Sequence, residues 1–148
     1  MKPLALLIAL AAALLGVWFA SQRGFGLGGD VHRDVPPSVA ALHRHFAQHG
    51  IATTVRLVRI ELAGAQARAL FTIKDAAERS FIVMWFGSAD TAAGNAAALN
   101  ASANPTLAES NGPFLLQLTH WSRDDPLSQQ VLTTFRSFDA ARAAALAR

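Results

Sequence analysis

The segment Leu4–Ala20 constrains the fold most, because it carries no charge and 16 of its 17 residues are apolar. As a helix it would span about 25 Å, close to the roughly 30 Å thickness of a bilayer's hydrocarbon core. Two aromatic residues stand at its end, where interfacial anchors usually lie. The segment therefore predicts an N-terminal transmembrane helix, anchored through Leu4, Leu7, Leu14, Trp18 and Phe19.

A cleaved signal peptide is the alternative interpretation of this segment. Its apolar region would normally run about 7–15 residues and end in small residues before the cleavage site. Cleavage after Ala20 would place Trp18 where a small residue is needed, which favours an uncleaved anchor over residues 1–22. The abundance of alanine and arginine is typical of a bacterial protein. We therefore expect a single-pass protein of the bacterial inner membrane with its C-terminal domain in the periplasm.

The glycines that follow the anchor resemble a phosphate-binding motif in letters only. Gly24–Gly29 matches G-x-G-x-x-G, but a dinucleotide site needs a strand before the glycines and a helix directly after them. Here the run follows the apolar segment and leads to Pro36 and Pro37, which do not continue a helix. We interpret residues 23–37 as a flexible linker and residues 38–148 as an extracytoplasmic domain.

Charge and composition exclude several classes of function. The formal net charge is +3, and residues 24–148 hold 11 basic and 10 acidic residues, dispersed rather than clustered. This pattern argues against nucleic acid as a partner, because phosphate binding needs a concentrated basic face. The chain has no cysteine, which excludes disulfides, cysteine-ligated zinc and a thiol nucleophile.

Residue periodicity in the remaining chain predicts a small α+β domain. We expect an antiparallel four-stranded sheet with helices packed mainly on one face, a two-layer sandwich in the order α-β-β-β-α-β-α. The expected helices cover Ser38–Gln48 with Ser38 as the N-cap, residues 89–100 capped by Ser88, and a segment capped by Asp124 or Asp125 before Pro126. The expected strands cover residues 51–62, 67–74, 81–86 and 114–121.

Two segments of the domain are expected to be irregular. Residues 101–113 contain glycine, proline and several polar residues, which indicates a long loop. The tail Ala140–Arg148 favours a helix but offers few apolar side chains to bury, so we expect it to fray.

Histidines form the first candidate site. His45 and His49 stand four residues apart on an expected helix, so both imidazoles could reach one zinc or copper ion, with His32 as a further ligand. The alternative is that these histidines are solvated neighbours on the polar side of the helix, and Arg44, directly before His45, would repel a cation.

The second candidate site is the junction after the last strand. A hydroxyl, a histidine and carboxylates at Ser122, His120 and Asp124 have the residue types of a small hydrolase. The same serine and aspartates also suit a helix N-terminus, which needs acceptors for its free N–H groups. Trp121, with His120 beside it, is the expected contact with a partner.

The interpretation that fits these patterns best is a membrane-anchored interaction module without catalytic activity. Its expected partner is a protein of the cell envelope, docked on a sheet face free of helices or on residues 101–113, and a homo-oligomer is compatible with the sequence. No cofactor is required. A periplasmic metal-binding domain using the histidine pair and a small hydrolase remain the alternatives.

Overall fold

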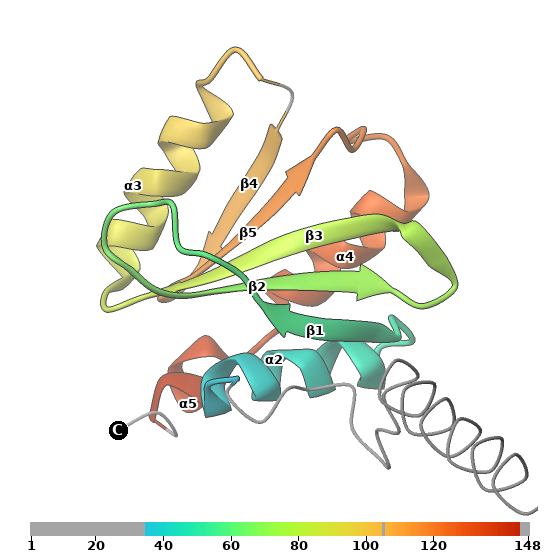
Figure 1. The fold of residues 1–148 in the computed structure, drawn as a ribbon, viewed down its shortest axis with the longest axis horizontal. Helices are drawn as coiled ribbons and strands as arrows, with labels where there is room; N and C mark the ends of the chain where they lie inside the picture. Colours follow the sequence, from blue (N-terminus) through green and yellow to red (C-terminus); the bar gives the residue numbers. More distant parts are fainter. Residues whose placement is uncertain (1–34, 105, 146–148) are drawn as a thin grey trace, which may run out of the picture.

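The computed structural model describes residues 35–104 and 106–145, which form an α+β domain (Figure 1). The expected anchor Leu4–Ala20, most of the linker and His32 lie outside these residues. No helix in the described ranges is long and apolar enough to cross a membrane. The elements are α2 (Pro37–Gln48), β1 (Thr53–Leu57), β2 (Ala65–Ile73), β3 (Ala76–Phe86), α3 (Ala89–Asn100), β4 (Thr106–Asn111), β5 (Phe114–Thr119), α4 (Pro126–Arg136) and α5 (Ala140–Ala145).

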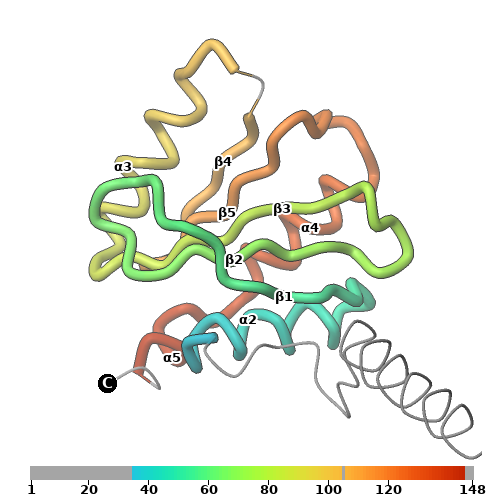
Figure 2. Tube along the Cα trace, in the orientation of Figure 1, coloured from blue at the N-terminus to red at the C-terminus, as the bar shows by residue number. Residues whose placement is uncertain are grey.

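The strands form one antiparallel sheet in the order β1-β2-β3-β5-β4 (Figure 2). β1, β2 and β3 follow each other as a meander, which confirms that part of the sequence prediction. β3 is the central strand, and its segment Phe81–Phe86 is apolar on both faces: Phe81 and Val83 belong to the core on one face, and Met84 and Phe86 to the core on the other. After β3 the chain passes through α3 to the far edge, so β4 is outermost and β5 returns to pair with β3.

The expectation of four strands was wrong, since β4 lies within the segment interpreted as a loop. Alternation places Leu107, Glu109 and Asn111 on one face of β4, and only the first of them is apolar. Glu109 instead pairs with Arg136 of α4, with one oxygen 2.8 Å from Arg136 Nη2. Asn111 Nδ2 donates to the carbonyl oxygens of Phe135 and Phe138, at 2.7 and 2.9 Å. Polar contacts therefore replace the hydrophobic pattern that would have revealed the strand.

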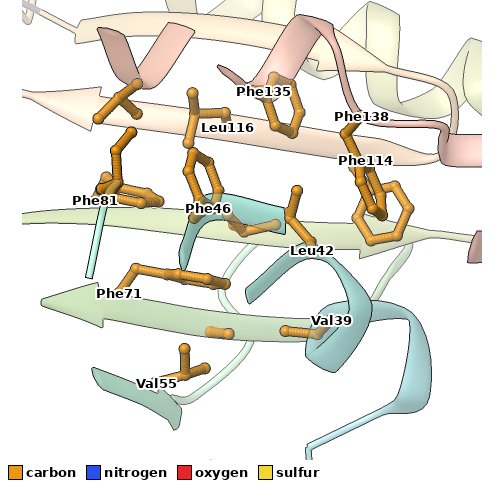
Figure 3. Close-up of a cluster of buried hydrophobic side chains, with 14 of the residues drawn as sticks. Val39, Leu42, Phe46, Val55, Phe71, Phe81, Phe114, Leu116, Phe135 and Phe138 are labelled. Atoms are coloured by element: carbon orange, nitrogen blue, oxygen red, sulfur yellow. The ribbon is translucent and has the colours of Figure 1, made fainter. Parts of the chain in front are cut away.

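α2 packs on the sheet through an aromatic core (Figure 3). Val39, Leu42 and Phe46 of α2 have no exposed surface. The helix begins at Pro37 rather than after Ser38, because proline suits the first helical position. Ser38 is not the N-cap; it is buried and its hydroxyl makes no hydrogen bond within the described residues. Gly50 ends the turn after α2 with a φ of 79°.

Helices cover both faces of the sheet, so the expected two-layer arrangement was incomplete. The core on the α2 face also includes residues of α4 and α5, whereas α3 lies on the opposite face (Figure 1). Ala92 and Ala96 of α3 pack over Met84, Phe86 and Leu115. The predicted caps of α3 and α4 are confirmed: Ser88 Oγ accepts from Thr91 N–H, and Asp125 accepts from Ser128 N–H.

The expectation that the C-terminal tail frays was wrong for α5. Ala140 and Ala143 are buried, with 5% and 3% of their surface exposed, and the helix packs against α2. Gly112, in the turn between β4 and β5, allows Ala140 at the start of α5 to lie close to this turn. Its φ is 53°, and a Cβ there would lie 2.9 Å from the Cβ of Ala140.

Both edges of the sheet are protected by side chains from helices. At the β1 edge, His43 Nε2–H of α2 donates to the Thr53 carbonyl at 2.9 Å, and Thr53 and Val55 are almost fully buried. At the β4 edge, the amide of Asn100 in α3 binds both backbone groups of Ala108, at 2.7 and 2.9 Å. Edge strands offer unpaired backbone groups that attract other strands, so these contacts oppose sheet extension.

We predict that Asn100→Ala destabilises the domain and exposes the β4 edge. The loss of two hydrogen bonds to Ala108 should lower the free energy of unfolding by about 1–2 kcal/mol. Urea denaturation followed by tryptophan fluorescence measures this change. Asn95→Ala on the same helix is the matched control, because in residues 35–104 and 106–145 the Asn95 side chain bonds only the Thr91 carbonyl of its own helix. Equal stability of the two variants would contradict the role of Asn100.

Candidate functional site

Part of the sheet face on the α3 side carries no helix, and we call its exposed portion the open strip. α3 contacts β3, β4 and β5 on this face, leaving the β1 and β2 side uncovered (Figure 1). Alternation along the strands turns Arg68, which lines the cleft described below, and six further side chains toward this side, all exposed or half-buried. The open strip consists of Thr54, Arg56, Leu70, Thr72, Ser80 and Ile82.

The open strip is organised in two rows that run across the strands. One row pairs Thr54 with Thr72 and Thr72 with Ser80, so three hydroxyl groups follow each other. The next row pairs Arg56 with Leu70 and Leu70 with Ile82. Cross-strand neighbours on one face lie about 4.5–5.5 Å apart at Cβ, which makes each row a continuous surface. The result is an apolar centre beside hydrogen-bonding groups and one guanidinium.

A small cleft lies where the uncovered face meets α3. Its volume is about 170 Å³, and its lining includes Leu62, Arg68, Met84 and Leu99. Arg68 Nη1 donates to the Arg59 carbonyl at 2.9 Å and lies 2.9 Å from Glu61 Oε2. These bonds hold the chain after β1 against the sheet, so the guanidinium of Arg68 has a structural partner already.

Two large apolar side chains stand out at the β1 end of the sheet. Leu57 and Ile60 are 39% and 43% exposed, while the other large apolar side chains in the described ranges are more covered. Leu57 ends β1, and Ile60 lies in the connection to β2. Alternation places Leu57 on the α2 face with Thr53 and Val55, opposite the open strip, so its exposed surface does not enlarge the strip.

The structure places His45 and His49 together, with ring centroids 4.2 Å apart. His45 Nε2–H donates to the Thr134 carbonyl and to Ser137 Oγ, both at 3.0 Å, and so joins α2 to α4. His49 Nδ1–H donates to the His45 carbonyl at 2.9 Å. A metal could bind Nε2 of His45 only after this nitrogen released its proton and both acceptors.

Burial lowers the pKa of His45 below its ordinary value of 6.5, and the nearby His49 lowers it further. The bond to the Thr134 carbonyl acts in the opposite direction. His45 is therefore neutral at neutral pH, which is the form a metal needs. In the described part of the chain, however, no group of three or more histidine, aspartate and glutamate side chains is arranged to hold an ion.

The junction after β5 uses its polar residues for structure. Asp125 Oδ2 accepts from Ser128 N–H at 2.9 Å and from Arg79 Nη2 at 2.5 Å. The Arg79 guanidinium also lies 4.1 Å above the Trp121 ring, and Trp121 is only 8% exposed. Arg79 thus covers the indole that the sequence suggested as a partner contact.

His120 is exposed and adopts a left-handed backbone conformation with a φ of 63°, which turns the chain away from β5. Among the described residues, it makes no hydrogen bond to Ser122 or Asp124. Ser122 Oγ accepts from the backbone N–H of Asp124 at 3.3 Å instead. The geometry of a catalytic triad is therefore not assembled at this junction.

The sequence predicted a docking face free of helices, and the alternation that creates the open strip was visible in β2. The pattern identified a wet face but could not show which part of that face α3 would cover. Comparison of the chain with protein-family models, with curated proteins and with solved structures gave no match. The candidate sites consequently depend on geometry alone.

We predict that Asp125 contributes to stability in a pH-dependent way. The N–H of Ser128 holds the pKa of Asp125 below its ordinary value of 3.8, and Arg79 lowers it further. This stabilisation is complete above pH 3.8 and is lost as the pH falls through the lower, folded-state pKa. Asp125→Asn should therefore show a shallower loss of stability below pH 4 than the parent chain.

Urea denaturation between pH 2.5 and pH 7 checks this expectation. Asp124→Asn is the control, because within the described part of the chain the Asp124 carboxylate has no bonding partner. A decline of the Asp125→Asn variant in acid as steep as that of the parent chain would show that this carboxylate does not drive it.

Proposed function

We propose that this protein is a membrane-anchored interaction module of the bacterial inner membrane, without catalytic activity, whose periplasmic domain binds an envelope protein. The observation that carries the proposal is the open strip, the part of the α3-side sheet face that no helix covers. Its mixture of apolar, hydroxyl and guanidinium groups resembles the composition of protein interfaces, where apolar contacts lie beside hydrogen-bonding groups.

The shape of this surface favours a protein partner over a small ligand. The strip is a face of paired strands, and the cleft beside it is only about 170 Å³. Pockets for small molecules are usually larger, about 300–1,000 Å³, and enclose most of the ligand. The two protected sheet edges also disfavour strand addition, so we place the partner on the face of the sheet.

The predicted anchor and linker would keep this surface close to the membrane. A domain held at the membrane by residues 1–22 and a linker over residues 23–37 would search a limited volume around its anchor. Tethering of this kind raises the effective concentration of a partner in the same membrane, so a modest docking surface is sufficient.

Site-specific photocrosslinking in membranes tests the proposal. A benzophenone amino acid at Thr72, in the open strip, should give one dominant crosslinked protein from the full-length chain. Thr133 is the control position, because it is exposed on α4 at the opposite face. Crosslinks that are absent, or equally diverse at both positions, would refute docking on the strip.

We predict that Leu70→Asp reduces the crosslink formed at Thr72 at least about tenfold. Arg56 lies opposite this position and would partly pair the new carboxylate, but the lost apolar contact and the desolvation of both charges in the interface still cost more than the 1.4 kcal/mol of a tenfold loss. Thr133→Asp introduces the same charge on the opposite face and should leave the crosslink unchanged. Circular dichroism of both variants verifies that the domain remains folded.

Metal binding is the second candidate function, favoured by the 4.2 Å separation of the His45 and His49 rings. If the pair binds zinc or copper, the double replacement by alanine should abolish stoichiometric binding in a calorimetric titration. His43→Ala is the control, because His43 bonds the Thr53 carbonyl at the sheet edge instead. Binding that survives the double replacement would exclude the pair as the site.

A further inference from the structure

A second cleft lies on the other side of the domain, between α2 and α5. Its volume is about 360 Å³, within the range of small-molecule pockets. Phe138 and the small side chains of Ala41 and Ala143 form its apolar wall. The remaining lining residues are polar or charged: Arg44, His45, Gln48, Asp139 and Arg142.

Two arginines from different elements converge on this cleft. Arg44 belongs to α2 and Arg142 to α5, nearly a hundred residues later in the chain. Within the described ranges, neither guanidinium has a hydrogen-bonding or ionic partner. Arg68 in the smaller cleft differs, because its guanidinium already bonds to Glu61 and to a backbone carbonyl oxygen. The guanidinium groups of the larger cleft therefore remain available to an anion.

The other polar groups of the cleft have defined roles. Asp139 Oδ1 accepts from the backbone N–H of Arg142 at 3.0 Å and so caps the first turn of α5. His45 directs Nε2–H away toward Thr134 and Ser137 of α4 and the turn after it. Gln48 adds an amide donor to the lining. Among the lining residues that the structure describes, the fixed charges are then two guanidinium groups against one carboxylate, which is a positive balance.

We propose that this cleft binds a phosphate group between Arg44 and Arg142. The planar guanidinium group donates paired N–H bonds that match phosphate oxygens, and Phe138 with the two alanines would receive an apolar part of the ligand. A soluble phosphate compound and the headgroup of an anionic phospholipid share this chemistry. The site lies apart from the open strip and does not depend on the proposed function.

Nuclear magnetic resonance of the full chain in a nonionic detergent tests the site, with inorganic phosphate as the probe. The arginine Nε–H signals of Arg44 and Arg142 should shift on titration. Arg44→Gln and Arg142→Gln should each weaken binding at least about tenfold, because each removes a charge-assisted hydrogen bond. Arg123→Gln is the control, since this arginine lies outside the cleft and its side chain has no partner in the described ranges.

A third variant distinguishes a built site from general attraction to basic residues. Asp139→Asn keeps a side-chain acceptor for the first turn of α5 but removes the negative charge from the cleft. It should strengthen phosphate binding by about two- to fivefold. The parallel change Asp124→Asn lies outside the cleft and should have no effect.

Nanodiscs separate the two sources of phosphate. Shifts of Arg44 and Arg142 with phosphatidylglycerol but not with phosphatidylcholine would assign the site to a lipid headgroup. Shifts with inorganic phosphate and equal spectra in both nanodiscs would assign it to a soluble compound. No shift in any of these conditions, or an unchanged phosphate affinity in each single arginine variant, measured from the signal of the remaining arginine, would overturn the proposal.

Discussion

Contacts among three phenylalanine rings hold α2 against the sheet, and the position of α2 determines how much of the remaining structure packs. Phe71 and Phe81 are paired across β2 and β3, and their rings stack at 5.1 Å with an angle of 16°. Phe46 of α2 contacts both, at 5.8 and 5.1 Å (Figure 3). Aromatic contacts of this kind stabilise by about 0.5–1.5 kcal/mol beyond the area they bury. They fix the position of α2, and hence where His43 meets β1, where His45 meets α4 and where α5 can pack.

The opposite face of the sheet is covered by much smaller side chains. α3 buries mainly Ala92 and Ala96, which bring the helix close to Met84 and Leu115 but cover little area. A helix with larger side chains would stand further from the sheet and reach more of it. Because α3 is also held at one edge by Asn100, it cannot slide toward β1. The uncovered part of the sheet is thus a consequence of α3's composition and of its tether to β4.

Local patterns in the sequence predicted most of the elements. The meander, the caps at Ser88 and Asp125 and the buried segment Phe81–Phe86 were all recognisable, because each depends on residues close in sequence. β4 was missed because Glu109 and Asn111 face the helices and bond to groups far along the chain. α5 was misjudged because its burial depends on Gly112, whose lack of a side chain admits Ala140. Both errors have the same cause. Polar or small residues lie where two segments distant in sequence meet, so no apolar pattern marks the contact.

The same limit applied to the candidate sites. The spacing of His45 and His49 correctly indicated neighbouring rings, but it could not show that Thr134 and Ser137 already accept from His45. From the sequence, Arg44 was interpreted only as a positive charge that would repel a cation from these histidines. The sequence could not show that α5 places Arg142 in the same cleft as Arg44.

The cleft and the open strip lie on opposite faces of the sheet, so a ligand in one leaves the other accessible. Any coupling between them would have to pass through β2 and β3. On one face of these strands Phe71 and Phe81 pack against α2, and on the other Leu70 and Ile82 form part of the open strip. Coupling of this kind is reciprocal: a phosphate that stabilised one position of α2 and so tightened partner binding would itself be bound more tightly when the partner was present. A rigid aromatic core transmits little continuous deformation. Two independent binding events, one on each face, therefore follow more directly from this packing than an allosteric switch.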